Sequence, residues 1–226
     1  MLSGIFYTIE AVILSLVSFK FWEAYKGKKS RTTFNFFRSI VFEIIFFFFL
    51  GLSSLFLINQ PGVLKTAFII AMGFLFLALS FGIRPWAYAK LPKPSQGLLT
   101  FSPLFLGSLI IVLYYISPGY PEVNSQGILQ WNLPLTSFFL FELMILGYCL
   151  ALAIEFVAAG KKSPGIRKRS MLTALTLFLI ALGSALQIIP KAPEIILLAG
   201  HLLLLLAFGL GFMAFFFKDQ SSKDYQ

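Results

Sequence analysis

The sequence predicts an all-α polytopic membrane protein with seven transmembrane helices, its amino terminus outside the cell and its carboxyl terminus in the cytoplasm. Of the 226 residues, 58% are hydrophobic and only 12% are charged. A soluble domain of this composition would have a largely apolar surface. The apolar residues form long runs, and the basic residues collect in every second gap between them. We therefore treat 1–226 as a single transmembrane domain.

Seven apolar runs are each long enough to cross a bilayer, whose hydrocarbon core of about 30 Å needs roughly 20 residues of helix. The runs are continuous rather than alternating, which favours helices over barrel strands. The longest stretch between them, Ser117–Asn132, is too short for a folded extramembrane domain. We expect the first run to be retained, because no small-residue cleavage site follows it. The predicted spans are Leu2–Phe21, Ser39–Ile58, Leu64–Ile83, Leu98–Ile116, Leu133–Val157, Met171–Ile189 and Ala192–Phe217.

The distribution of basic residues predicts the direction of the chain. Only Lys65 and Lys191 lie on the side that we assign to the outside, and the positive-inside rule places the other sixteen in the cytoplasm. Topology therefore explains the net charge of +9 without nucleic acid, and the basic loops could also contact anionic lipid head groups. We expect a bacterial or archaeal cytoplasmic membrane. The cytoplasmic set is Lys20, Lys26, Lys28, Lys29, Arg31, Arg38, Arg84, Lys90, Lys93, Lys161, Lys162, Arg167, Lys168, Arg169, Lys218 and Lys223.

Aromatic residues lie near the predicted ends of the spans. Amphipathic rings prefer the interface between lipid and water, so these positions support the boundaries. The inner set is Trp22, Tyr25, Trp86 and Tyr88, and the outer set is Tyr114, Tyr115, Tyr120 and Trp131.

An internal repeat is visible when the chain is shifted by about 132 residues. The shift places Glu10 on Glu142, Glu23 on Glu155 and Gly51 on Gly183. It relates 1–83 to 133–217, with the span 98–116 as a connector. Both units enter the membrane from outside, so the predicted repeats are parallel.

This three-one-three organisation resembles sugar transporters of the SWEET class, which have parallel repeats. The seven-helix outline also resembles bacterial seven-helix sensor domains. Both resemblances cover the whole chain in architecture only and imply no substrate. The Pro-Gln signature of the SWEET class is absent, and we expect no proline in the middle of a span. Covalent retinal is excluded, because no lysine lies between Lys191 and Lys218.

Three ionisable residues, Glu10, Glu142 and His201, lie eight or nine residues into their spans. A charged group there costs about 3 kcal/mol. At a rise of 1.5 Å per residue all three lie roughly 12–14 Å below the outer surface. If they converge, they could bind a solute or carry protons, because burial favours the neutral form of a carboxyl. Alternatively each group hydrogen-bonds a neighbouring helix, which is the favoured role for His201. No ligand spacing supports a metal site.

A second group of charged residues lies near the predicted cytoplasmic edge. Arg84 could pair with Glu43 or Glu155, either as an inner gate or as a structural ion pair. The structural ion pair is the simpler interpretation, since long side chains near the interface can reach water. We expect Gln187 and Glu194, near the outer ends of their spans, to be solvated.

The sequence contains no catalytic motif, and we expect neither an enzyme nor a cofactor. One histidine cannot form a bis-histidine haem site, and the single Cys149 cannot form an intrachain disulfide. Our first hypothesis is a small-solute transporter that could be proton-coupled, with a midplane site between the repeats. Our second is a sensor or receptor-like module that signals through a separate cytoplasmic partner on the basic loops.

Overall fold

The computed structural model describes residues 2–124 and 127–216, and within them the chain forms seven long helices and one β-hairpin. The seven predicted spans are confirmed as helices long and apolar enough to cross a membrane, as expected of an integral membrane protein. Lys218, Lys223 and the last residue of the seventh predicted span lie outside the described residues. The elements are α1 (Leu2–Lys28), α2 (Arg31–Phe56), α3 (Pro61–Lys90), α4 (Lys93–Ile116), β1 (Glu122–Val123), β2 (Leu129–Gln130), α5 (Leu135–Lys162), the 3₁₀ turn η1 (Pro164–Ile166), α6 (Arg167–Ile188) and α7 (Glu194–Phe216).

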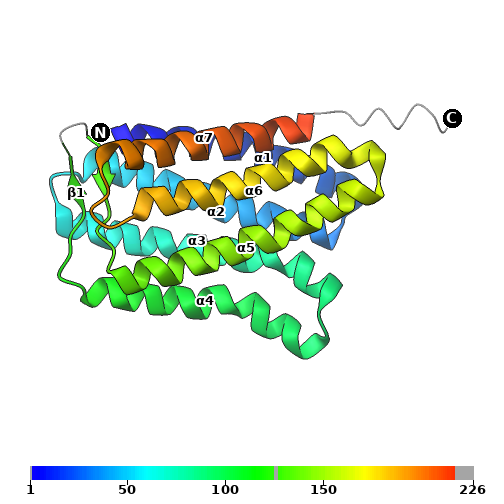
Figure 1. Cartoon of the computed structure of the whole chain (residues 1–226), viewed down its shortest axis with the longest axis horizontal. Coiled ribbons are helices and arrows are strands. Elements are labelled where there is room, and N and C mark those ends of the chain that lie inside the picture. Colours follow the sequence, from blue (N-terminus) through cyan, green and yellow to red (C-terminus); the bar gives the residue numbers. More distant parts are fainter. Residues whose placement is uncertain (1, 125–126, 217–226) are drawn as a thin grey trace.

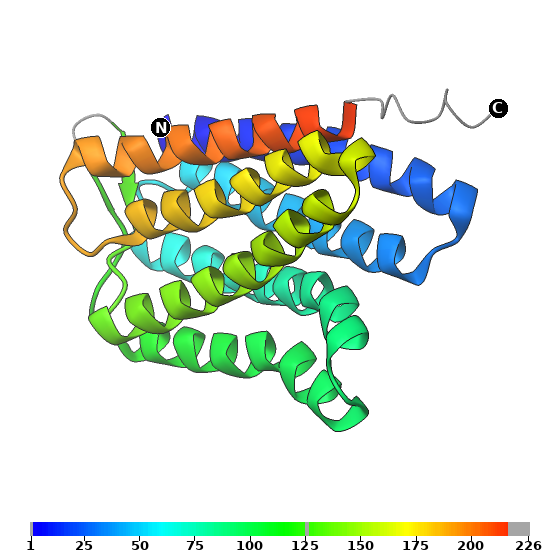
Figure 2. The same ribbon diagram turned by 45° about the vertical axis from the view of Figure 1, so that its right-hand side comes forward.

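The helices form a ring in which each packs against its neighbours in sequence, and α7 closes the ring against α1 (Figures 1 and 2). All connections except the one between α4 and α5 are short, and sequential helices run antiparallel, so the bundle has two distinct ends. The hairpin end carries β1, β2 and the start of α1. The basic end carries the α1–α2, α3–α4 and α5–α6 connections. The orientation of these ends in a membrane and the internal repeat remain predictions.

At the basic end the helices are longer than predicted. α1 continues to Lys28 rather than ending at Phe21, and α2 begins at Arg31 rather than Ser39. Lysine and arginine are good helix formers, and their apolar stems can cover neighbouring surface while the charge stays in water. Lysines in the last turns of α1 and α5 also complement the negative end of the helix dipole.

The expectation that no proline lies in the middle of a span is wrong for Pro103. Because α4 begins at Lys93 rather than at Leu98, this proline is the eleventh of its 24 residues, and Pro85 lies within the longer α3. Pro103 has no N–H to donate to the carbonyl of Leu99. The hydroxyl of Ser102 donates to that oxygen instead, at 2.9 Å.

The segment between α4 and α5 folds over the hairpin end of the ring. β1 and β2 pair antiparallel, with Val123 opposite Leu129. Ile128 is fully buried and packs with Ala192 and Leu197 near the α6–α7 connection. The segment therefore forms a plug, which we define as Ile128–Leu133, although it is too short for a separate domain.

The plug corrects the role predicted for two of the outer aromatic residues. Trp131 is only 1% exposed, and Tyr114 is equally buried, so neither ring lies in the lipid–water interface. The Tyr114 hydroxyl donates to the backbone oxygen of Trp131 at 2.7 Å. Tyr115 and Tyr120 are exposed, as the interface interpretation expects.

The outer surface of the ring is apolar. On α1, exposed large side chains recur every three or four residues, which places them in one stripe facing away from the bundle. Such a surface is suited to lipid. The stripe consists of Ile5, Ile9, Val12, Leu16 and Phe19.

Candidate functional site

The centre of the ring contains an internal chamber of about 450 Å³. Its lining comes from α1, α2 and α3 on one side and from α5, α6 and α7 on the other, and α4 contributes nothing to it. Of the 35 described residues that line it, 11 are aromatic and most of the others are aliphatic. This volume is within the range of about 300–1,000 Å³ typical of small-molecule pockets.

The two ends of the chamber differ in exposure. At the hairpin end the lining includes Tyr7, Trp131 and Gln187, all of which are buried. At the basic end it includes Arg169 and Ile166, and Ile166 is 37% exposed. From this difference we infer that the plug closes the chamber and that the chamber opens at the basic end.

Glu43 is the one acidic residue among the described residues that line the chamber. It is the thirteenth of 26 residues in α2, at the middle of the helix. The sequence placed it near the cytoplasmic edge, because the predicted span began at Ser39 rather than at Arg31. Within 2–124 and 127–216 its carboxylate forms neither a hydrogen bond nor an ion pair. Tyr148 and Cys149 of α5 line the same chamber.

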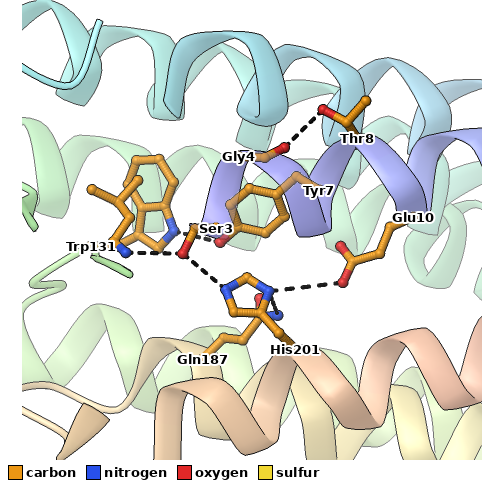
Figure 3. Close-up of polar contacts among 9 residues, drawn as sticks. Ser3, Gly4, Tyr7, Thr8, Glu10, Trp131, Gln187 and His201 are labelled. Carbon is orange, nitrogen blue, oxygen red and sulfur yellow. Dashed lines mark hydrogen bonds and ion pairs between the residues drawn. The ribbon is translucent and has the colours of Figure 1, made fainter. Parts of the chain in front are cut away.

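A buried cluster of polar side chains, which we call the histidine cluster, consists of His201, Gln187 and Ser3 (Figure 3). His201 of α7 is 1% exposed. Gln187 Nε2 lies 2.8 Å from His201 Nδ1, and Ser3 Oγ lies 3.1 Å from His201 Nε2. Ser3 Oγ also accepts the backbone N–H of Leu129 at 2.9 Å, which ties the plug to the cluster.

The contact with Gln187 determines the proton position on the imidazole. A side-chain amide nitrogen can only donate, so Nδ1 of His201 must accept. We therefore expect the ring proton on Nε2, directed at Ser3 Oγ, and a neutral imidazole. Phe6 stacks on this ring with centroids 4.9 Å apart, and Tyr7 meets it edge-on at 5.0 Å.

Glu10 of α1 lies beside the cluster. Its Oε1 is 3.9 Å from His201 Nδ1, and the side chain is 0% exposed. Neither carboxyl oxygen has a hydrogen-bond partner among the described residues. An uncompensated charge in such a place is very costly. The structure thus brings Glu10 and His201 together across the α1–α7 contact.

The third residue predicted for this site, Glu142, lies elsewhere. It belongs to α5, which packs on α4 and α6, and it is half-buried with one partnerless oxygen in the described part of the chain. Neither Glu10, Glu142 nor His201 is on the lining of the chamber.

Gln187 belongs both to the histidine cluster and to the chamber lining. This position was not predicted from the sequence. It was expected to be solvated, but it is 7% exposed, lines the chamber and bonds to His201. Tyr7 also links the two: it lines the chamber, contacts His201, and its hydroxyl accepts the Trp131 indole N–H at 3.0 Å. The available signal for Gln187 was its place inside a predicted span, where an amide needs a partner.

The ion pair expected between Arg84 and Glu43 or Glu155 is not present in the described residues. Glu155 pairs with Lys90 at 3.1 Å, and both side chains are exposed. Such a surface pair contributes little to stability. The guanidinium of Arg84 lies 4.1 Å from the ring centroid of Phe81.

No family model, curated protein or solved structure matches this chain. No group of three His, Cys, Asp or Glu side chains suited to a metal ion occurs in the described ranges. The chamber and the histidine cluster are therefore the features of this chain that bear on its function.

Proposed function

We propose that this protein is an integral membrane transporter that binds a small solute in the chamber, with the basic end in the cytoplasm. The observation that carries the proposal is the chamber itself, which lies between α1–α3 and α5–α7 and has a lining that is buried at the plug and includes exposed residues at the basic end. Alternating access requires a site between two groups of helices that opens to one side at a time. The positive-inside rule supports the orientation.

Gln187 offers a route for coupling the solute to a proton. A solute that accepts a hydrogen bond from the Gln187 amide would compete with His201 Nδ1 for that donor. Once released, Nδ1 could accept the proton of a neutral Glu10, whose Oε1 is 3.9 Å away. The transfer converts a neutral acid and a neutral imidazole into a carboxylate and an imidazolium, so no net charge is created. Glu142 has no part in this scheme.

A second function, as a sensor or receptor-like module, is favoured by the plug. Trp131, Ile128 and Leu129 are fully buried at the hairpin end, as expected if the chamber never opens there. A ligand would then enter and leave by the basic end, where the helix extensions offer a surface for a separate cytoplasmic partner.

The accessibility of Cys149 distinguishes these functions. It is the only cysteine of the chain and lines the chamber. We expect a membrane-impermeant, cationic methanethiosulfonate reagent to modify it in vesicles of both orientations, because a transporter exposes its chamber to each side in turn. Modification from the basic side alone would overturn transport and support the receptor.

A second reporter cysteine controls for the case in which the Cys149 thiol reacts poorly. Ser184 lines the chamber on α6, and Ser184→Cys combined with Cys149→Ser moves the reporter to another position on the lining. Agreement of the two reporters is required for either conclusion. Denatured protein gives the full extent of labelling for each.

A further inference from the structure

The chamber combines an apolar, aromatic wall with one carboxylate. Phe46, Phe47 and Tyr148 line it together with Glu43. The faces of aromatic rings attract cations, and aromatic cages are a common way to bind quaternary ammonium groups. An aliphatic and aromatic wall elsewhere in the chamber suits a hydrocarbon chain.

The carboxylate of Glu43 has no compensating partner of its own in the described residues. It lies at the middle of α2, and it faces a chamber rather than a packed core. An ionised carboxylate away from bulk water is costly unless a positive charge accompanies it. A cationic group bound in the chamber would supply that charge where the protein does not.

The other charge on the lining lies at a different level. Arg169 is the third residue of α6, next to the exposed Ile166 at the basic end. Glu43 is separated from the start of its helix by three turns, and it has Ser39 and Tyr148 as polar neighbours on the lining. The deeper part of the chamber is therefore acidic and the entrance is basic.

We infer that the chamber binds a lipophilic cation, a molecule with an ammonium-type head group and an apolar chain, and that Glu43 pairs with the head group. This assignment rests on the proposed function for its context, because it names the class of solute that the transporter would carry. The chain of the ligand would lie along the aromatic and aliphatic wall between α1–α3 and α5–α7.

Binding can be tested with two probes of similar length and opposite charge, n-octyltrimethylammonium and n-octanesulfonate. The purified protein is placed in nanodiscs of neutral lipid, and alkylation of Cys149 by N-ethylmaleimide is followed. Because Cys149 lines the chamber, only a probe that enters should slow the reaction. We expect the cation to protect Cys149 and the sulfonate not to protect it.

The variant Glu43→Gln removes the charge and keeps the shape of the side chain. We expect it to raise the concentration of the cation needed for protection by about tenfold or more, a typical loss for one charge pair. Glu43→Asp should retain the preference for the cation. Glu23→Gln is the matched control, because Glu23 is an exposed carboxylate paired with Lys20 outside the chamber.

Thermal stabilisation by each probe provides a second measurement if a variant alters the reactivity of Cys149. Equal protection by cation and sulfonate, or undiminished cation binding in Glu43→Gln, would overturn the inference. Cation binding without labelling from the hairpin side would retain the inference and remove transport. Labelling from both sides without cation binding would support transport and overturn the inference.

Discussion

The buried carboxyl groups of this protein differ in what lies beside them. Glu10 is in contact with a cluster that includes an imidazole, Glu43 faces the chamber, and Glu142 of α5 is neither in that cluster nor on the chamber lining. These surroundings, rather than depth in the bilayer, separate their chemistry. A carboxyl beside a titratable ring can exchange a proton with it, whereas a carboxyl facing a cavity can pair with whatever enters.

The proton position on His201 can be predicted from its contacts. With Gln187 Nε2 at 2.8 Å from Nδ1, the imidazole should be neutral with its proton on Nε2. His201 is the only histidine, so ¹⁵N-histidine labelling gives a single imidazole spectrum that needs no assignment. We expect one acceptor-type and one protonated nitrogen at neutral pH.

Two variants identify which neighbour is responsible. Glu10→Gln should leave the spectrum unchanged, because the nearest Glu10 oxygen is 3.9 Å from Nδ1. Gln187→Leu should shift the acceptor nitrogen, because it loses its donor. Two protonated nitrogens in the unmodified protein, converted to one by Glu10→Gln, would instead indicate a resting ion pair between Glu10 and His201.

Gly107 allows α4 to approach α3 closely. A Cβ added at Gly107 would lie 2.2 Å from the ring of Phe76, which is buried in the core. The two helices must separate or Phe76 must leave its rotamer. We expect Gly107→Ala to reduce the free energy of unfolding by about 1–3 kcal/mol, the usual cost of overpacking.

The matched control is Gly73→Ala. Gly73 lies on α3, the helix that carries Phe76, and an added Cβ there meets nothing within 4 Å. It should be neutral or slightly stabilising, because alanine favours helix more than glycine does. Both variants can be compared by denaturant unfolding in the same micelle. Equal stability of the two would contradict the close α3–α4 approach.

The two glycines that the predicted repeat matches, Gly51 and Gly183, do not pack against equivalent helices. Gly51 of α2 faces Thr8 and Gly4 of α1, whereas Gly183 of α6 faces Gly200 and Leu204 of α7. If α1 corresponds to α5, equivalent glycines would face equivalent helices. The sequence match at this pair therefore reflects a shared need for a small residue, with different partners.

The spans could be predicted because each apolar run is long enough to identify a helix without tertiary information. The helix ends could not, because Lys28 and Arg31 lie beyond the apolar runs yet continue the helices. Because of that error Glu43 was predicted near the cytoplasmic edge, and its position on the chamber lining was not predicted. The contact between Gln187 and His201 depends on how α6 and α7 are rotated, which one sequence does not specify.

The plug determines whether the hairpin end of the bundle can open. Trp131 is its largest side chain, stacking on Phe68 with centroids 4.1 Å apart and donating to Tyr7 of α1. It therefore joins the plug to α3 and α1 at once, and a movement that opens this end has to break both contacts. The α1–α7 contact, bridged by Glu10 and His201, is beside it.

Removal of the Trp131 indole should open the closed end of the chamber. We expect Trp131→Ala to increase several-fold the rate at which an impermeant thiol reagent modifies Cys149 from the hairpin side. The truncation should also reduce stability by about 3–5 kcal/mol, as for other buried aromatic residues. Trp131→Phe keeps an aromatic ring and most of the volume but loses the N–H and the second ring, so access should remain close to that of the unmodified protein.

Tyr115→Ala is the control for a general loosening of this end, because Tyr115 is 72% exposed and outside the plug. Its labelling rate should equal that of the unmodified protein. An unchanged rate in a folded Trp131→Ala variant would mean that the indole does not form the barrier. The closure would then have to come from the buried aliphatic residues of the plug and from Tyr7, and opening would require the whole hairpin to leave the ring rather than one side chain to turn.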